Sequence, residues 1–285
     1  MVSLNCWHVL EPCLESLARS KLPVPFEITL VDNASSDNTV AQVRRQFPDV
    51  HIIENKSNVG FTKATNQAIF ISSGKYILWL NTDTILQTDS LYQLWWFLES
   101  HAEAGIVGPK VLNGDRSFQP QCRRGKPTLV ASIAYFSRIY KLFPESQRLG
   151  EYLLAYLPVN QPAQVVSVSG CCLLARREVW TDIGPLDQAI FGFGEDIEWC
   201  YRACQAGWQV WYFPKSEIIH LKGQGGVHSN PLGKEWGIHQ AMWVFYRKHL
   251  RKEYWCGVGG IVWAGIWTKF LVSLVISVVR RRFKL

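Results

Sequence analysis

Two oxygen-bearing side chains follow a short apolar run in the first third of the chain. The run at 76–80 has the length and composition of a buried strand, and it ends at Asn81-Thr82-Asp83. Residues two apart on an extended backbone point to the same side, so Asn81 and Asp83 can contact one ligand. Their oxygens suit Mg²⁺ or Mn²⁺ carrying a diphosphate, and open α/β sheets bind ligands at such strand ends. A plain strand-ending turn is the alternative interpretation.

Paired acids at the start of a predicted helix form a second candidate centre. Glu195 and Asp196 follow the glycine-rich residues 191–194, and Glu198 comes soon after them. Clustered carboxylates tend to raise the pKa of one member, which suits a general base. We expect Asp196 to be that base. The alternative is that the acids only complement the positive end of the helix dipole.

Strand and helix patterns alternate along residues 1–115, which we expect to form one half of the molecule. Helices are predicted at 10–19, 39–47 and 61–72, and strands at 27–31, 50–54 and 76–80. The connections between these elements are short. The alternation predicts an α/β fold with a mostly parallel central sheet that is flanked by helices.

The rest of the chain divides into three parts of different composition. Residues 116–232 contain the paired acids and, up to about residue 164, an aromatic and basic stretch. That stretch forms either amphipathic helices against a membrane or a lipid-linked partner, or an ordinary helical insertion. An amphipathic helix is predicted at 233–253, and a hydrophobic, membrane-associated tail at 254–285.

The C-terminal tail indicates a membrane surface. Residues 254–279 are apolar except for Lys269, which gives enough length to span a bilayer, although a charge near the middle is costly. The formal net charge is +7, and basic clusters at 247–252 and 280–282 flank the tail, which favours a membrane over nucleic acid. We expect attachment through the tail, with crossing left open. A buried C-terminal helix is the alternative.

Four segments in chain order carry a pattern that resembles the family 2 glycosyltransferases with the GT-A fold. The segments are DNASSD at 32–37, NVGF at 58–61 with Asn66 after it, Asn81-Thr82-Asp83, and FGFGEDIEWCYR at 191–202. The likeness covers roughly residues 5–229 and is strongest to rhamnosyltransferase-like members of surface-polysaccharide assembly. It implies a GT-A fold and transfer of a sugar from a nucleoside diphosphate.

The resemblance also implies a donor site. Asp32 matches the family's base-reading Asp, and Asp83 and His220 match positions that face a divalent cation, Mg²⁺ or Mn²⁺. A lone His is otherwise often structural, and Arg202 has a helical salt bridge with Glu198 as its alternative. The donor, a dTDP- or UDP-linked sugar, is expected to contact Asn5, Asp32, Asn58, Gly60, Asn66, Asn81 and Arg202.

The acceptor side follows from the same resemblance. Inverting transfer needs one carboxylate to remove the acceptor's hydroxyl proton, and Asp196 with Glu195 matches that role. The acceptor is expected to be a lipid-linked or polysaccharide glycan at the cytoplasmic face of the cell membrane, with no nucleic acid involved. The residues expected to contact it are Gly170, Arg123 and Glu198.

Two other classes of protein compete with this interpretation. A dinucleotide oxidoreductase on a similar sheet is excluded, because no GxGxxG follows the first strand. A catalytically inactive, membrane-bound binder of nucleotide sugars or glycans remains the alternative, because only four residues precede Asn5 and the first strand is therefore clipped.

Overall fold

The first quarter of the chain folds into a small parallel sheet with helices packed against it. The computed structural model describes residues 1–224 and 231–283. The sheet has the order β1-β2-β3, and Ser3 pairs with Asp32 while Asp32 pairs with Glu54. Its elements are β1 (Val2–Ser3), α1 (Trp7–Ala18), β2 (Thr29–Asp32), α2 (Thr39–Gln46), β3 (His51–Glu54) and α3 (Phe61–Ile71). The sequence predicted each of these elements except β1 within a few residues.

The second sheet is mixed and contains the centre of the core. Its order is β4-β10-β6-β11-β5, and β8 pairs with β11. Strands β4, β6 and β11 share one direction, whereas β10 runs antiparallel between β4 and β6. The elements are β4 (Tyr76–Leu80), β5 (Thr84–Leu86), α4 (Ser90–Ser100), β6 (Ala104–Leu112), β8 (Ala163–Val165), β10 (Cys172–Arg176), α7 (Arg177–Ile183), α8 (Glu195–Gln205) and β11 (Gln209–His220). The α/β prediction is confirmed, and the antiparallel strands β10, β5 and β8 are the difference from a mostly parallel sheet.

Residues 163–176 form three short strands that change direction. β8 ends at Val165, and β9 (Ser167–Val168) pairs with β7 (Arg123–Arg124) in a separate ribbon. Gly170 and Cys171 then form a turn before β10 enters the main sheet. The sequence pattern does not reveal this turn, because β9 and β10 are both largely buried and their residues look alike in the sequence.

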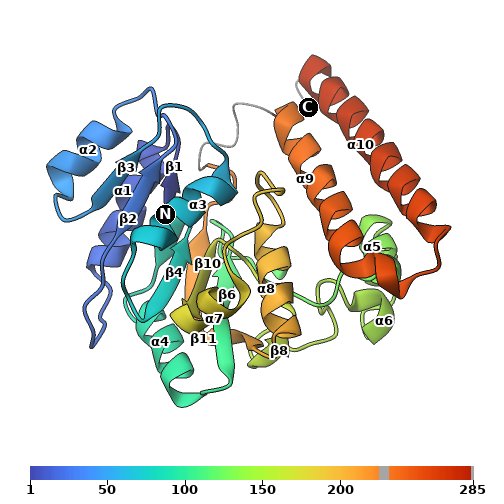
Figure 1. Ribbon diagram of the computed structural model, residues 1–285, viewed down its shortest axis with the longest axis horizontal. Helices are drawn as coiled ribbons and strands as arrows, with labels where there is room; N and C mark the ends of the chain where they lie inside the picture. Colours follow the sequence, from blue (N-terminus) through green and yellow to red (C-terminus); the bar gives the residue numbers. More distant parts are fainter. Residues whose placement is uncertain (225–230, 284–285) are drawn as a thin grey trace.

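The C-terminal part forms a pair of helices beside the sheets. α9 (Pro231–Phe245) continues into a π-helical turn at Tyr246–Leu250, and α10 (Val258–Phe283) runs back along it next to α5 (Leu129–Phe136) and α6 (Gln147–Gly150) (Figure 1). The Trp236 and Trp267 ring centroids lie 4.9 Å apart across the α9–α10 contact. Among the described residues, Val258–Ile276 is the one helical stretch that is long and apolar enough to cross a membrane.

Arg123 anchors the core and does not face an acceptor site, so its expected role is corrected. Its guanidinium donates to the carbonyl oxygens of Pro158 (2.8 Å) and Leu157 (2.6 Å) and stacks on the Tyr212 ring. The side chain is fully buried, and burial lowers its pKa. Arg123 therefore ties the 157–158 segment to β11.

Replacement of Arg123 by Met should destabilise the fold by about 2–4 kcal/mol, because two hydrogen bonds from a charged group and the stacking on Tyr212 disappear. Urea unfolding of the variant measures this. Arg45→Met, at an exposed arginine, should change stability by less than about 0.5 kcal/mol. Wild-type stability in Arg123→Met would contradict the anchoring role.

Candidate active site

Asp32 and Asn5 lie side by side at the end of β2, as the sequence predicts. The Asp32 carboxylate accepts hydrogen bonds from Ser3 Oγ (3.0 Å) and from the backbone N–H of Ser35 (2.8 Å). Asn5 Oδ1 accepts from the backbone N–H groups of Ser36 (2.7 Å) and Asp37 (3.2 Å). These bonds fix the loop after β2 against the end of β1, so both side chains have a defined place at the carboxyl edge of the sheet.

Asn58 and Gly60 shape the neighbouring loop and connect it to a distant one. Asn58 Oδ1 accepts from the Gly60 N–H (2.9 Å) and from Asn33 Nδ2 (3.2 Å), a partner that no local pattern indicates. Gly60 has φ of +87°, and a side chain there would approach the Phe191 ring to 2.7 Å. The Phe191 carbonyl accepts from the Phe61 N–H at the start of α3 (3.1 Å). The glycine-rich loop 191–194 is thus docked on the NVGF segment.

Asn66 has a structural role where donor contact was expected. It is buried, its Nδ2 donates to the Leu186 carbonyl (2.9 Å), and its Oδ1 accepts from the Leu186 N–H (3.0 Å). Both ends of the amide are therefore engaged by the backbone of one residue, Leu186. Asn66 holds the segment that leads into loop 191–194.

Asp83 and His220 meet where β5 and β11 pair. His220 Nε2 lies 3.2 Å from Asp83 Oδ1, and the Gln224 N–H donates to Asp83 Oδ2 (3.2 Å). Burial alone would raise the pKa of Asp83, but the hydrogen bond and charge of His220 outweigh it, so the pKa is lowered. His220 Nδ1 contacts Gln119 Oε1 (3.1 Å), which orients the ring. Gln119 is a site residue that its sequence context did not reveal.

The donor atoms at this edge fit a divalent cation that arrives with a diphosphate. Asp83 supplies a carboxylate, His220 a ring nitrogen, and Asn81 Oδ1 is buried without a hydrogen-bond partner in the described part of the chain. No group of three or more His, Cys, Asp or Glu side chains among the described residues is arranged to hold a metal alone. A site with few protein ligands is usual for Mg²⁺, because the ion keeps several waters and also binds the phosphates of the substrate.

Asp196 is fixed by one charged side chain and one backbone group. Arg124 Nη1 donates to Asp196 Oδ2 (3.0 Å), and the Gly170 N–H donates to the same oxygen (2.9 Å). Burial would lower the pKa of Arg124, but the Asp196 charge outweighs it and raises the pKa. A side chain at Gly170 would approach the Trp79 ring to 2.9 Å and Asp196 Cβ to 3.2 Å, so glycine is required there. Arg124 was missed in the sequence because its partner is distant along the chain.

Glu195 is a buried acid with a raised pKa. It is buried, and its Oε2 lacks a hydrogen-bond partner among the described residues. Burial and then the Asp196 charge raise the pKa of Glu195 to about 8. Glu195 is therefore protonated at neutral pH beside the Asp196–Arg124 ion pair. The two adjacent acids thus have different surroundings, because Asp196 is bound by Arg124 and Gly170 whereas Glu195 Oε2 has no hydrogen-bond partner in the described part of the chain.

The turn at Gly170 and Cys171 joins the two candidate centres. The Cys171 carbonyl accepts from the Asn81 N–H (2.9 Å) and from Thr84 Oγ1 (3.2 Å), while the preceding residue binds Asp196. The segment after β4, which carries the candidate cation ligands, and the acids of α8 are thereby held by two neighbouring residues. The residues expected at the two centres are linked through this turn.

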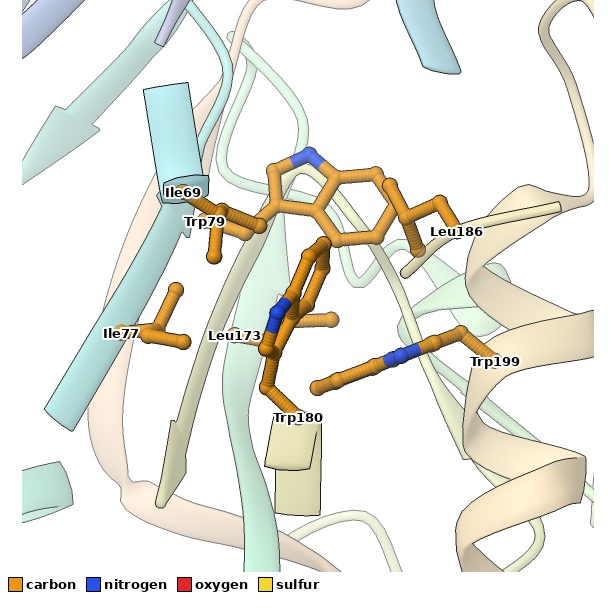
Figure 2. A pocket seen from close by; sticks show the side chains of 7 residues that line it. All are labelled: Ile69, Ile77, Trp79, Leu173, Trp180, Leu186 and Trp199. Carbon is orange, nitrogen blue, oxygen red and sulfur yellow. The ribbon is translucent and has the colours of Figure 1, made fainter. Parts of the chain in front are cut away.

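An apolar pocket lies beneath Trp79, whose ring packs next to Gly170 of the turn. Figure 2 shows the Trp180 and Trp199 rings under the Trp79 ring, among aliphatic side chains. Trp199 Nε1 donates to the Gly184 carbonyl (3.1 Å). The lining offers no polar contact to a sugar, so the pocket acts as packing beneath the site.

Glu198 and Arg202 form the helical salt bridge, so their expected substrate contacts are corrected. Arg202 Nε lies 2.9 Å from Glu198 Oε1, and its other nitrogens donate to the Ile183 carbonyl and to the Pro185 carbonyl (2.8 Å). Glu198 is buried and also contacts His249 Nε2 (3.0 Å). The group ties α8 to the segment before loop 191–194 and to the π-helical turn.

Solved structures share this architecture over nearly the whole chain. The Pyrobaculum calidifontis mannosyltransferase PcManGT, in complex with GDP-Man and Mn²⁺, matches with a TM-score of 0.60 at 15% identity, covering 98% of this chain and 73% of that one. S. aureus TarS 1-349, in complex with UDP-GlcNAc, matches with a TM-score of 0.57 at 15% identity, covering 93% and 70%. The fold is the GT-A glycosyltransferase fold, as the sequence predicted.

The chain belongs to glycosyl transferase family 2, whose model matches residues 1–180. The N-acetylglucosaminyl-diphospho-decaprenol L-rhamnosyltransferase of Mycobacterium tuberculosis is 25% identical over 233 residues, 78% of this chain and 74% of that protein. The low-salt glycan biosynthesis hexosyltransferase Agl10 of Haloferax volcanii is 26% identical over 209 residues, 70% and 61%. The protein is thus a glycosyltransferase with rhamnosyltransferase-like relatives, and its acids at 195–196 lie beyond the family match.

The raised pKa of Glu195 predicts a specific dependence of stability on pH. Its pKa is about 8 in the folded protein and near 4.5 when unfolded, so its stabilising contribution is complete below pH 4.5 and is lost as pH rises to 8. Between pH 5 and 8.5, wild type should lose roughly 2–4 kcal/mol more than Glu195→Gln, which has no proton to lose. Urea unfolding at both pH values measures this, and parallel profiles would contradict the assignment.

Proposed function

We propose that this glycosyltransferase transfers a sugar, with rhamnose as the first candidate, from a dTDP- or UDP-linked donor to a lipid-linked or polysaccharide acceptor in cell-surface glycan synthesis. The observation that carries the proposal is the turn at Gly170 and Cys171, which holds Asp196 and the Asn81–Thr84 segment through adjacent peptide groups. Sugar transfer from a nucleoside diphosphate requires a base for the acceptor and a site for the diphosphate. The turn holds a candidate for each.

In the proposed reaction the configuration at the anomeric carbon is inverted in one displacement. Asp196 takes the proton of the acceptor hydroxyl as its oxygen bonds to the anomeric carbon, and the bond from that carbon to the diphosphate oxygen breaks. Arg124 and the Gly170 N–H keep Asp196 oriented. Asp83, His220 and Asn81 would hold Mg²⁺ or Mn²⁺, which as a Lewis acid neutralises charge on the leaving diphosphate.

The substrate assignments rest on the relatives and on the C-terminal helix. The Mycobacterium tuberculosis relative is a rhamnosyltransferase whose name gives a lipid-linked diphosphate sugar as acceptor. Val258–Ile276 is apolar and largely exposed, which supports attachment to a membrane. We therefore place the enzyme at the cytoplasmic face of the cell membrane, attached through the C-terminal segment, where a lipid-linked acceptor is within reach.

Substitution of Asp196 by Asn should reduce transfer by at least about a hundredfold and leave donor binding within a few-fold, because it removes the base but keeps a similar shape. Release of nucleoside diphosphate is measured for detergent-solubilised protein against UDP-, dTDP- and GDP-sugars with acceptor lipid, with Mn²⁺ or with chelator. Isothermal titration measures donor binding. Turnover in Asp196→Asn equal to wild type would exclude the proposed base.

Asp83→Ala is the matched variant for the other centre, and it should lose metal-dependent donor binding as well as turnover. The second candidate is a membrane-bound binder of nucleotide sugars without catalysis. Metal-dependent donor binding by wild type with no transfer to any acceptor would support that candidate and overturn the proposed activity.

A further inference from the structure

The side chains that α10 exposes are apolar, whereas a helix exposed to water turns polar side chains outward. Its exposed positions between 258 and 276 are apolar or small apart from Thr268, and they include Ile261, Leu271 and Val275. Lys269 is the single charged residue in that stretch, and it is partly buried. A helix that turns apolar side chains outward and its charge inward is typical of a lipid environment.

Lys269 binds the folded body of the protein at the midpoint of α10. Its Nζ lies 3.1 Å from His239 Nε2 on α9 and 4.5 Å from the centroid of the Phe136 ring on α5. The Trp267 and Phe270 rings on either side of it pack on Trp236. Two elements of the body therefore cover one side of α10 at half its length, where a crossing helix would be surrounded by hydrocarbon.

α5 lies alongside the first half of α10 and extends the same apolar surface. The Leu129 N–H at its start donates to Tyr254 Oη just before α10 (3.3 Å), and Phe136 at its end touches Lys269. Ile133 on α5 is exposed, as are Leu142 and Phe143 at the end of the following turn η2 (Ile139–Leu142). We call α5, η2 and the outer side of α10 the docking surface.

Basic side chains accompany the docking surface. Arg138, Lys141 and Arg148 are exposed between α5 and α6, with Glu145 as the one acid among them, and residues 251–252 add two exposed cations before Trp255. Exposed apolar side chains next to cations match a bilayer that contains anionic lipid.

We propose that the docking surface lies flat on an anionic bilayer, with α10 in the plane of the interface and α5 and η2 inserted beside it. This inference rests on the proposed membrane attachment and deepens it, because it assigns the mode of attachment and adds η2 to it. α10 keeps its contacts with α9 and α5 in this arrangement, and Lys269 keeps His239 and Phe136 as partners.

Vesicle flotation tests the contribution of η2. Wild type should bind phosphatidylcholine vesicles containing phosphatidylglycerol and bind less at high salt. Leu142→Asp with Phe143→Asp should weaken binding at least about tenfold, because the inserted side chains become charged. Phe70→Asp with Ile71→Asp is the matched control: these neighbours on α3 are 67% and 51% exposed, against 75% and 53% for Leu142 and Phe143, and lie away from α10 (Figure 1).

The control pair should bind as wild type does. Equal binding by the η2 variant and wild type would overturn the inserted η2. An equal loss in both variants would show that added charge alone is responsible, and would overturn it too.

A topology assay tests whether α10 lies in the plane. A cysteine is added after Leu285 in a Cys256→Ser background, since Cys256 is the one fully exposed thiol among the described cysteines. In sealed vesicles it should react with an impermeant maleimide from outside as fast as it does in detergent. Protection until detergent is added would mean that α10 crosses the bilayer. That result would overturn the in-plane mode but leave membrane attachment and sugar transfer standing.

No vesicle binding by wild type would overturn the attachment itself, independently of sugar transfer.

Discussion

The site depends on the hydrogen bonds of one turn, between β9 and β10. The Gly170 N–H binds Asp196, and the Cys171 carbonyl accepts from the Asn81 N–H and Thr84 Oγ1, so two peptide groups set the relation between the acids and the diphosphate edge. Backbone groups cannot be moved by side-chain rotation, which gives this link its rigidity. It also explains the antiparallel β10, because a strand that enters between β4 and β6 carries the turn to the carboxyl end of β4.

Local chemistry was enough to select the candidate site residues, and long-range partners decided the surroundings of each. Asn81, Asp83 and the acids at 195–196 follow strand or glycine-rich signals that can be seen in a short window. Arg123 and Arg124 are adjacent in the sequence and chemically equal. Successive side chains of a strand point to opposite faces, so Arg123 contacts Tyr212 and Arg124 binds Asp196. That register depends on the β7–β9 pairing, which no local pattern shows.

The same limit explains the acids and the misplaced donor residues. Arg124, 72 residues from Asp196 in sequence, is the ion-pair partner of that carboxylate, while burial and then the Asp196 charge raise the pKa of Glu195. Asn66 and Arg202 have side chains suited to a donor, but the backbone at 183–186 occupies them. The helix pair also reaches the site: Gln240 Nε2 on α9 donates to the Ala189 carbonyl, and Gly194 lies against Ala241. The element that carries the docking surface thus supports the loop that carries the acids.

The most direct test of the shared site is electron paramagnetic resonance of Mn²⁺ added to wild type with and without dTDP or UDP. The account predicts tight Mn²⁺ binding only with the nucleotide, with ³¹P coupling from the diphosphate and ¹⁴N coupling that disappears in His220→Ala. Mn²⁺–nucleotide binding that is the same in wild type, Asp83→Ala and His220→Ala would contradict the placement of the diphosphate at this edge.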